Sequence, residues 1–153
     1  MANIDTKEQQ SSTKTHIELR MRANTEYLCV ARTVVRQVVR ILGLKEDKCE
    51  LVALAVEEAL TNIIRHSYGG PCDKPIIMKL SKIDPYDENK PALEVTIRDF
   101  GRQVDPKSIK AGQLDELGLG GRGVHIIRSV MDEIEFSRAD DCGMQLRMLK
   151  YIT

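Results

Sequence analysis

Residues 51–68, LVALAVEEALTNIIRHSY, place polar side chains within an otherwise apolar helical pattern. At about 100° per residue the apolar side chains cover a broad arc, and further apolar residues of the first half lie outside that arc. The arc consists of Val52, Val56, Ala59, Leu60 and Ile63. The pattern predicts a helix from about residue 46 to residue 66 that is buried on most sides. Glu58 and Asn62 are four residues apart and therefore lie on one stripe of this helix.

The stripe of Glu58 and Asn62 has two interpretations. This spacing occurs by chance in many helices, so the stripe can simply face solvent. Alternatively it forms the polar floor of a ligand site, since unsatisfied polar groups on a largely buried helix are costly. An asparagine oxygen can coordinate Mg²⁺, and a glutamate one turn away can accept a proton from an attacking hydroxyl or water. The helix alone does not decide between them.

The rest of the chain consists of shorter strand and helix patterns. Alternating apolar and polar residues predict five strands. They span residues 15–22, 76–83, 92–98, 134–137 and 144–152. Further helices are expected at about 24–42, 106–110 and 124–131, and residues 84–91, DPYDENKP, predict a turn. Consecutive strands joined by short turns favour antiparallel pairing with the helices on one face.

Length and composition fit one globular domain. The chain has 153 residues, of which 42% are apolar and 30% charged, and we expect a disordered tail at residues 1–14 and a single domain at 15–153. The net charge of zero gives no argument for a nucleic-acid or membrane partner. No apolar run approaches the roughly 20 residues of a membrane span, and the first residues contain no signal-peptide pattern. Four scattered cysteines suit a reducing compartment, so we expect a cytoplasmic protein.

Residues 118–127, GLGGRGVHII, contain a literal G-x-G-x-x-G. The dinucleotide-binding motif needs a strand that runs into the glycines, whereas residues 107–116, KSIKAGQLDE, are charged and typical of a loop. The P-loop pattern G-x-x-x-x-G-K-[ST] is absent from the sequence. In a protein kinase the glycine loop precedes D-F-G, but here D-F-G, at residues 99–101, comes first. All three of these classes are therefore disfavoured.

The glycines are nevertheless compatible with a phosphate site. Glycine lets the backbone approach a ligand closely, and the free N–H groups at the start of the helix expected at residue 124 favour a phosphate. The residues concerned are Gly118, Gly120, Gly121 and Gly123. A flexible surface loop is the alternative. Arg122 can add charge to a phosphate or merely be solvated, and the sequence does not choose.

Asp99 and Gly101 follow the strand expected at 92–98. An aspartate at the end of a strand can accept a hydrogen bond from the exocyclic amine of a base, and a glycine nearby leaves room for a flat ring. The alternative is a strand-ending turn, which is common for D-x-G. Each of the three motifs is weak alone, but together they occur in a fixed order along the chain.

In this order the motifs resemble the GHKL ATPase superfamily, and within it the bacterial anti-sigma-factor serine kinases. Four stretches carry the resemblance and cover nearly the whole chain after the tail. They are VEEALTNIIRHSYGG (56–70), VTIRDFGRQVDP (95–106), GLGGRGVHIIRSVMDEIEF (118–136) and GMQLRMLK (143–150). The resemblance implies an α+β fold, a two-layer α/β sandwich of the Bergerat type. Its sheet would be mixed and mostly antiparallel, with the helices on one face.

The resemblance also implies an ATP and Mg²⁺ site between the sheet and the helices. Asn62 would hold Mg²⁺, and Glu58 would act as general base on a serine or threonine hydroxyl. Asp99 would bind the adenine amino group, with Gly101 beside the ring. The phosphates would lie under a glycine-rich lid. The lid residues implied as nucleotide-binding are Gly118, Gly120, Gly121, Arg122 and Gly123.

In function, the resemblance implies an ATP-dependent serine/threonine protein kinase that is also an anti-sigma factor. It would phosphorylate a small antagonist of the anti-anti-sigma (STAS) type and, in a partner-switching pathway, sequester a sigma factor. Family members often form homodimers, which fits the apolar helix at 24–42. On that helix Arg32 matches a position that touches partners in relatives, although it could equally be an ordinary surface arginine. Direct contact with nucleic acid or a membrane is not implied.

The sequence departs from the family pattern at two positions. Gln103 replaces the second glycine of the D-x-G-x-G box, a change that the anti-sigma branch tolerates. Met144 stands where many members have a threonine that helps to hold adenine through water, which puts that contact in question. The alternative function is a nucleotide-dependent protein-binding module of the same fold with little or no kinase activity, and the presence of Glu58 argues against it. A histidine-kinase fragment is disfavoured, because His16 lies in an expected strand and the next helix has no histidine.

Overall fold

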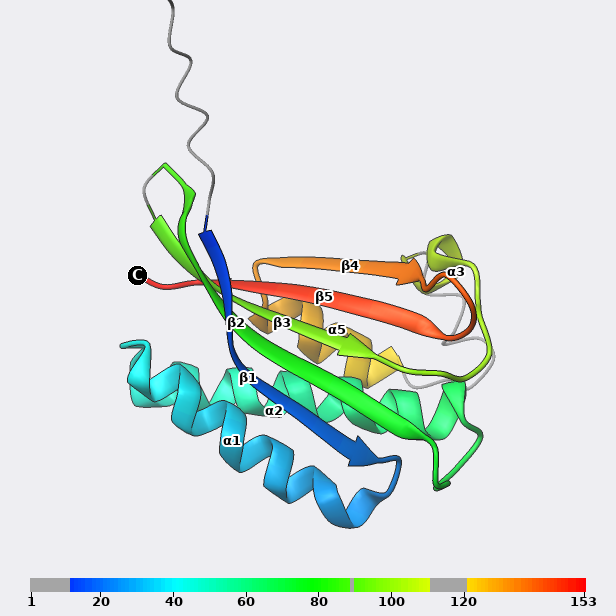
Figure 1. Ribbon diagram of the computed structural model, residues 1–153. Coiled ribbons are helices and arrows are strands. Elements are labelled where there is room, and N and C mark those ends of the chain that lie inside the picture. The colour runs from blue at the N-terminus through cyan, green and yellow to red at the C-terminus, as the bar shows by residue number, and fades with distance from the viewer. Residues whose placement is uncertain (1–11, 89, 111–120) are drawn as a thin grey trace, which may run out of the picture.

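The computed structural model describes residues 12–88, 90–110 and 121–153. Its elements follow one another as β1 (Ser12–Arg22), η1 (Thr25–Tyr27), α1 (Leu28–Ile41), α2 (Glu46–Asn62), η2 (Ile63–Ser67), β2 (Pro75–Asp87), β3 (Lys90–Arg98), α3 (Pro106–Lys110), α5 (Gly121–Val130), β4 (Glu133–Arg138) and β5 (Met144–Tyr151). Helices α1, α2 and α5 cover one face of a single sheet (Figure 1). The α+β sandwich that the sequence predicts is therefore confirmed.

The sheet has the strand order β1-β2-β3-β5-β4. Every pairing among the described strands is antiparallel, so this sheet is antiparallel throughout where the resemblance implied a mixed one. The antiparallel helices α1 and α2 return the chain to the end of β1 before β2 begins. There the backbone N–H of Ala23 donates to the carbonyl of Lys74 at 3.0 Å, which fixes the start of β2 beside the end of β1.

The first strand and the first helix follow the sequence prediction closely. β1 begins at Ser12, earlier than the predicted residue 15, and residues 1–11 of the predicted tail lie outside the described residues. The Asn24 side chain accepts a hydrogen bond from the backbone N–H of Glu26 at 3.1 Å and so caps the turn before α1. Gly43 ends α1 in the left-handed conformation, with a φ of 96°, which glycine adopts without steric cost.

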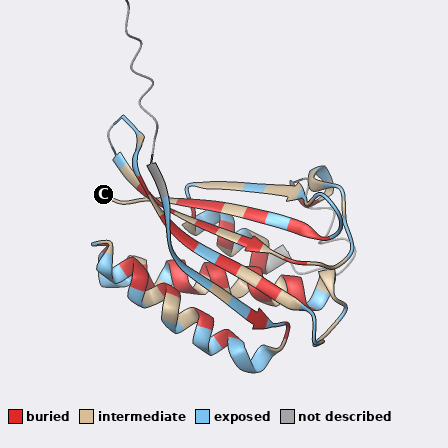
Figure 2. Cartoon of the chain, viewed as in Figure 1, coloured by how far each residue is buried: buried red, intermediate tan, exposed pale blue. Residues whose placement is uncertain are grey.

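Helix α2 lies between α1 and α5 (Figure 2), and seven of its 17 residues are buried while only three are exposed. Its buried residues are Cys49, Val52, Ala53, Ala55, Val56, Ala59 and Leu60. The prediction of a helix buried on most sides is confirmed, and Leu51 at 49% exposure marks its open side. The α-helix ends at Asn62, and the chain continues as the π-helical turn η2.

The predicted turn at residues 84–91 is wrong for most of its length. β2 continues to Asp87 and β3 begins at Lys90. The reason lies in cross-strand packing, which overrides the turn-rich composition. The Tyr86 ring packs on Tyr151 with ring centroids 6.0 Å apart, and the Tyr86 hydroxyl donates to the Glu133 carboxylate at 2.7 Å.

The second half of the chain contains the predicted elements at nearly the predicted places. α3 occupies residues 106–110 as expected, and α5 begins at Gly121, three residues before the predicted start. Among the described residues no helix has the length and apolar character to cross a bilayer. The end of α2, the end of β3 and the start of α5 carry all three sequence motifs, which makes their arrangement the central question for function.

Candidate functional site

Glu58 and Asn62 of α2 face the first turn of α5. A methyl group at position 123 would lie 3.0 Å from Glu58 Oε2, 3.0 Å from Asn62 Nδ2 and 3.2 Å from Asn62 Oδ1. Such distances are shorter than ordinary van der Waals contact, so only a glycine fits here unless the two side chains move. The structure thus brings together the polar stripe and one of the predicted glycines, and the solvent-facing interpretation of the stripe is wrong.

The two adjacent glutamates of α2 differ in their surroundings. Glu57 accepts a hydrogen bond from Arg32 of α1, with 2.9 Å between Arg32 Nη1 and Glu57 Oε2. Among the described residues neither the Glu58 carboxylate nor the Asn62 amide has a hydrogen-bond or ion-pair partner. Glu57 thus takes part in the contact between α1 and α2, whereas Glu58 and Asn62 face the first turn of α5.

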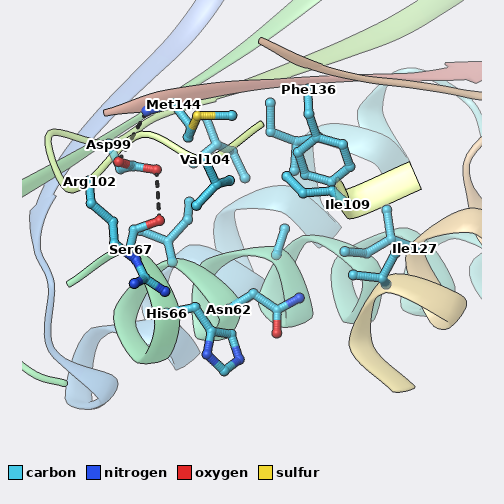
Figure 3. A pocket seen from close by; sticks show the side chains of 15 residues that line it. Asn62, His66, Ser67, Asp99, Arg102, Val104, Ile109, Ile127, Phe136 and Met144 are labelled. Atoms are coloured by element: carbon cyan, nitrogen blue, oxygen red, sulfur yellow. Dashed lines mark hydrogen bonds between the residues drawn. The ribbon is translucent and has the colours of Figure 1, made fainter. Parts of the chain in front are cut away.

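A pocket extends from Asn62 across to the ends of β3 and β5 (Figure 3). Its walls are mainly apolar and include Val104, Ile109, Ile127 and Phe136. Its polar side chains are Asn62, His66, Ser67, Asp99 and Arg102. An apolar cleft with a few placed polar groups is typical of small-molecule sites, and a flat aromatic base is suited to such walls.

Asp99 is the polar group at the sheet end of the pocket and is only 1% exposed. Its Oδ1 accepts hydrogen bonds from the backbone N–H groups of Gly101 at 2.9 Å and Met144 at 3.2 Å. Its Oδ2 accepts one from the Ser67 hydroxyl at 3.3 Å (Figure 3). Burial raises the pKa of Asp99, and the hydrogen bonds from Gly101, Met144 and Ser67 oppose that rise. The carboxylate is thus an acceptor of fixed orientation.

Two glycines allow the backbone around Asp99 to pack closely. A side chain at Gly101 would collide with the carbonyl oxygen of Ser67, and one at Gly143 would collide with the carbonyl oxygen of Asp99. Gly143 also has a φ of 74°, which side chains rarely allow. Gly101 does not line the pocket, so the structure gives it a packing role. Its predicted place beside a base stays a prediction.

The turn after Asn62 links the end of α2 to the end of β3. In η2 the N–H of Tyr68 donates to the carbonyl of Ile63, five residues earlier, at 3.1 Å. The Tyr68 hydroxyl accepts from the N–H of Phe100 at 2.8 Å and donates to the carbonyl of Pro75 at 2.6 Å. Burial raises the pKa of Tyr68 to about 12, so this donor stays protonated. Single π-turns of this kind are frequent at functional sites.

The structure describes only part of the predicted lid. Gly121 is the first residue of α5. The free N–H groups of the first turn of α5 therefore lie in the turn that meets Glu58 and Asn62. Gly118, Gly120 and the Arg122 side chain lie outside the described residues, and their roles stay predictions.

Comparison with known proteins assigns this chain to a family. Residues 21–150 match the family described as histidine kinase-like ATPase domain. The chain belongs to this family. It is 30% identical over 149 residues to the serine-protein kinase RsbW of Staphylococcus epidermidis, with 92% of this chain and 89% of the relative covered. It is 28% identical over 144 residues to the serine-protein kinase RsbW of Bacillus thuringiensis, with 89% and 84% covered.

The same fold occurs in a solved structure of low sequence identity. The crystal structure of the SiaB-SiaC complex from Pseudomonas aeruginosa contains a chain with a TM-score of 0.59 and 12% identity, and 89% of each chain is covered. The similarity to anti-sigma-factor serine kinases that the sequence predicts is confirmed at the level of the family. ATP binding and a divalent metal are what membership of this ATPase family implies.

Both sequence departures from the ATPase family pattern have structural consequences. Gln103 uses its side chain to donate a hydrogen bond to the carbonyl of Ala139 at 2.7 Å, which ties the loop after Asp99 to the turn between β4 and β5. Met144 contacts the pocket with its side chain and holds Asp99 with its backbone N–H. The backbone contact does not depend on which side chain stands at position 144, so a signal for it is absent from the sequence.

Three polar residues that line this pocket, His66, Ser67 and Arg102, were not among the predicted site residues. A usable signal for His66 was its place one helical turn after Asn62, on the same side of the helix. For Arg102 no signal exists in the sequence beyond proximity to Asp99, because the course of the loop decides where its side chain lies.

Proposed function

We propose that this protein is an ATP-dependent serine/threonine protein kinase and anti-sigma factor. Its substrate is a small anti-anti-sigma protein of the STAS type, and it sequesters a sigma factor when that antagonist is phosphorylated. The observation that carries the proposal is the meeting of Glu58 and Asn62 with Gly123, at one end of a pocket whose other end holds Asp99. Relatives of similar length named serine-protein kinase support it.

The pocket residues fit an adenine nucleotide. Oδ2 of Asp99 is oriented by the Ser67 hydroxyl and has capacity to accept a further hydrogen bond from the adenine amino group. The apolar walls suit the flat faces of the ring. Asn62 offers an amide oxygen of the kind that Mg²⁺ prefers, and it has no hydrogen-bond partner within the described part of the chain. When bound, Mg²⁺ neutralises charge on the phosphate oxygens.

In the transfer step Glu58 acts as the general base. Its carboxylate takes the proton of the serine or threonine hydroxyl while that oxygen bonds to the γ-phosphorus and the bond from phosphorus to the bridging oxygen breaks, which releases ADP. The free N–H groups at the start of α5 stabilise charge on the transferred group. A methyl group at position 123 would lie too close to the Glu58 and Asn62 side chains as they stand, so a phosphate there requires these side chains or the first turn of α5 to move.

The protein partners are proposed from the resemblance and not from the helix pattern that first suggested a dimer. The apolar side of α1 is buried within this chain, since Ala31, Val35 and Val39 have no exposed surface. Arg32 forms ion pairs with Glu57 at 2.9 Å and Glu50 at 3.6 Å, so within the chain it links α1 to α2. Its contact with a partner, like the homodimer, remains part of the proposal.

A pair of adjacent substitutions tests the proposed base. Labelled ATP with Mg²⁺ and a candidate anti-anti-sigma protein should yield phosphoserine or phosphothreonine with the native chain. Glu58→Gln should lower the transfer rate about 100-fold or more, while ATP binding persists, because only the proton acceptor is lost. Glu57→Gln is the matched control, since it changes the neighbouring carboxylate, which binds Arg32.

Two results would count against this assignment. Equal transfer by the native chain and the Glu58→Gln variant would remove Glu58 from its role. ATP binding by the native chain without transfer to any candidate protein would favour the alternative, a nucleotide-dependent binding module.

A further inference from the structure

The turn between β4 and β5 carries one of the two backbone N–H groups that hold the Asp99 carboxylate. Met144, the first residue of β5, donates its N–H to Asp99 Oδ1 at 3.2 Å (Figure 3). Its carbonyl accepts a hydrogen bond from the Asp99 N–H at 3.0 Å. The turn itself is closed by the N–H of Ala139, which donates to the carbonyl of Gly143 at 3.1 Å. The orientation of the Asp99 carboxylate therefore depends on where this turn lies.

Arg98 connects this turn to the end of β3. Its Nη2 donates a hydrogen bond to the carbonyl of Cys142 at 3.0 Å, and Cys142 directly precedes Gly143. Successive side chains of an extended chain point to opposite faces, so Arg98 lies on the face of the sheet opposite to Asp99, which lines the pocket. Arg98 thus contacts the backbone that supports the pocket, and the proposed function assigns it no role.

Two side chains fix this turn, one at each end. Gln103 donates to the carbonyl of Ala139, where the turn starts, at 2.7 Å, and Arg98 binds the carbonyl of Cys142, where it ends. Of the two, Arg98 binds next to the segment that contacts Asp99. A loss of the Arg98 contact should therefore affect Asp99 directly.

The other contacts of the Arg98 guanidinium hold it in place. Its Cζ lies 4.7 Å from the centroid of the Phe100 ring, a distance typical of a cation–π contact. The Phe100 N–H in turn donates to the Tyr68 hydroxyl. Among the described residues no carboxylate pairs with Arg98, and its Nε is buried without a hydrogen-bond partner. The guanidinium thus serves the turn and the ring rather than an ion pair.

We propose that Arg98 is a positioning residue for adenine recognition, because its hydrogen bond to the Cys142 carbonyl keeps the Met144 N–H on Asp99. The inference rests on the proposed nucleotide site and deepens it. With the turn in place Oδ1 is occupied, and Oδ2, oriented by the Ser67 hydroxyl, accepts the amino group of adenine. Without the Arg98 contact the carboxylate can rotate, and its preorganisation for the amino group is lost.

Binding of ATP and of inosine triphosphate measures this preorganisation, because inosine has a carbonyl where adenine has its amino group. Calorimetric titration gives both dissociation constants for the native chain and two variants. Arg98→Met keeps the apolar stem and loses the donor. Arg98→Lys restores a donor and a cation, and the Nε that lysine lacks has no partner among the described residues. Arg20→Met is the matched control, since Arg20 is exposed on the outer strand β1.

We expect the native chain to bind ATP about tenfold to a hundredfold more tightly than inosine triphosphate, as for one well-placed hydrogen bond to a charged group. Arg98→Met should weaken ATP binding about tenfold and leave the binding of inosine triphosphate unchanged. Arg98→Lys should recover most of the ATP affinity, and Arg20→Met should match the native chain. The affinity for inosine triphosphate is an internal control for folding.

Hydrogen exchange tests the position of the turn without any nucleotide. The amide proton of Met144 should exchange about tenfold faster in Arg98→Met than in the native chain, because its hydrogen bond to Asp99 is loosened. The amide proton of Met148, which lies within β5 and has no exposed surface, should keep its native rate. Equal acceleration of both amide protons would mean that Arg98 acts only on general stability, which would overturn the inference.

The binding experiment separates failure of the inference from failure of the proposed function. An unchanged ratio of the two affinities in Arg98→Met, or an equal loss for both nucleotides, overturns the inference alone. If the native chain binds ATP and inosine triphosphate equally well, Asp99 does not accept the amino group, and the inference fails with that assignment. If the native chain binds neither nucleotide, the proposed function fails as well.

Discussion

At the sheet end of the pocket the Asp99 carboxylate is almost fully buried and accepts three hydrogen bonds, whereas at the helix end Glu58 and Asn62 have no partner among the described residues. Both ends depend on a glycine that lets the chain approach a polar side chain or backbone. Gly143 packs on the backbone of Asp99, and Gly123 packs on the flexible ends of Glu58 and Asn62. The comparison indicates that the proposed base site is already held in place by hydrogen bonds, whereas the groups proposed for chemistry lack such bonds among the described residues.

Gly143→Ala should have the largest effect on stability. The new methyl group would collide with the carbonyl of Asp99, and φ at this position is 74°. We expect a loss of about 3 kcal/mol in unfolding free energy, with a fall of roughly 10 °C in melting temperature. Thermal and urea unfolding measure it. A melting temperature equal to that of the native chain would mean that the Asp99 end is not rigid.

Asp99→Asn should have the next largest effect, on affinity. The N–H groups of Gly101 and Met144 hold an oxygen at Oδ1, so the new amide nitrogen takes the Oδ2 position and presents N–H groups to the adenine amino group. We expect ATP affinity to fall about 100-fold at unchanged far-UV circular dichroism. Calorimetric titration measures it. Native affinity in the variant would exclude Asp99 as the adenine acceptor.

The pH dependence of ATP affinity provides a second test of the Asp99 carboxylate. Burial raises the pKa of Asp99 in the folded chain, so ATP affinity of the native protein should fall as protonation removes the acceptor, at a pH above the usual range of an aspartate. The Asn variant should lack this dependence. Since the folded pKa lies above the unfolded one, this group favours folding at low pH, and that contribution is lost as the pH rises through the folded pKa.

Gly123→Ala should have the smallest effect of the three substitutions and should separate function from stability. The methyl group meets only the ends of the Glu58 and Asn62 side chains, which can move aside, and alanine favours a helix more than glycine. We expect a melting temperature within a few degrees of native and a loss of about tenfold in phosphate transfer. His125→Ala, an exposed position of the same helix, is the control. A large loss of stability in Gly123→Ala would contradict the proposed difference in rigidity between the two ends of the pocket.

The sequence predicted the helix end of the pocket better than the sheet end. Glu58 and Asn62 were visible because a 3.6-residue period places them on one stripe, and Gly123 belonged to an evident glycine run. At the sheet end the determining contacts are between backbone groups. The N–H of Met144, the carbonyl of Ser67 under Gly101 and the positive φ of Gly143 depend on the course of the chain and leave no pattern in a single sequence.

Two features of the fold were beyond local patterns for similar reasons. The π-turn at Ile63–Ser67 leads into Tyr68, whose hydroxyl binds the backbone of Pro75, seven residues later, and of Phe100, 32 residues later. The extension of β2 to Asp87 arises from the packing of Tyr86 on Tyr151, far along the chain. In both cases long-range contacts outweigh local preference, which window-based reasoning does not include.

The most direct test of the account is the Mg²⁺ dependence of ATP binding. Calorimetric titration with and without Mg²⁺ compares the native chain with Asn62→Ala. We expect the native chain to bind one ATP more tightly when Mg²⁺ is present, and the variant to bind ATP with an affinity that Mg²⁺ no longer increases, because the proposed metal ligand is missing. Failure of the native chain to bind ATP, or a full Mg²⁺ effect in the variant, would contradict the proposed site.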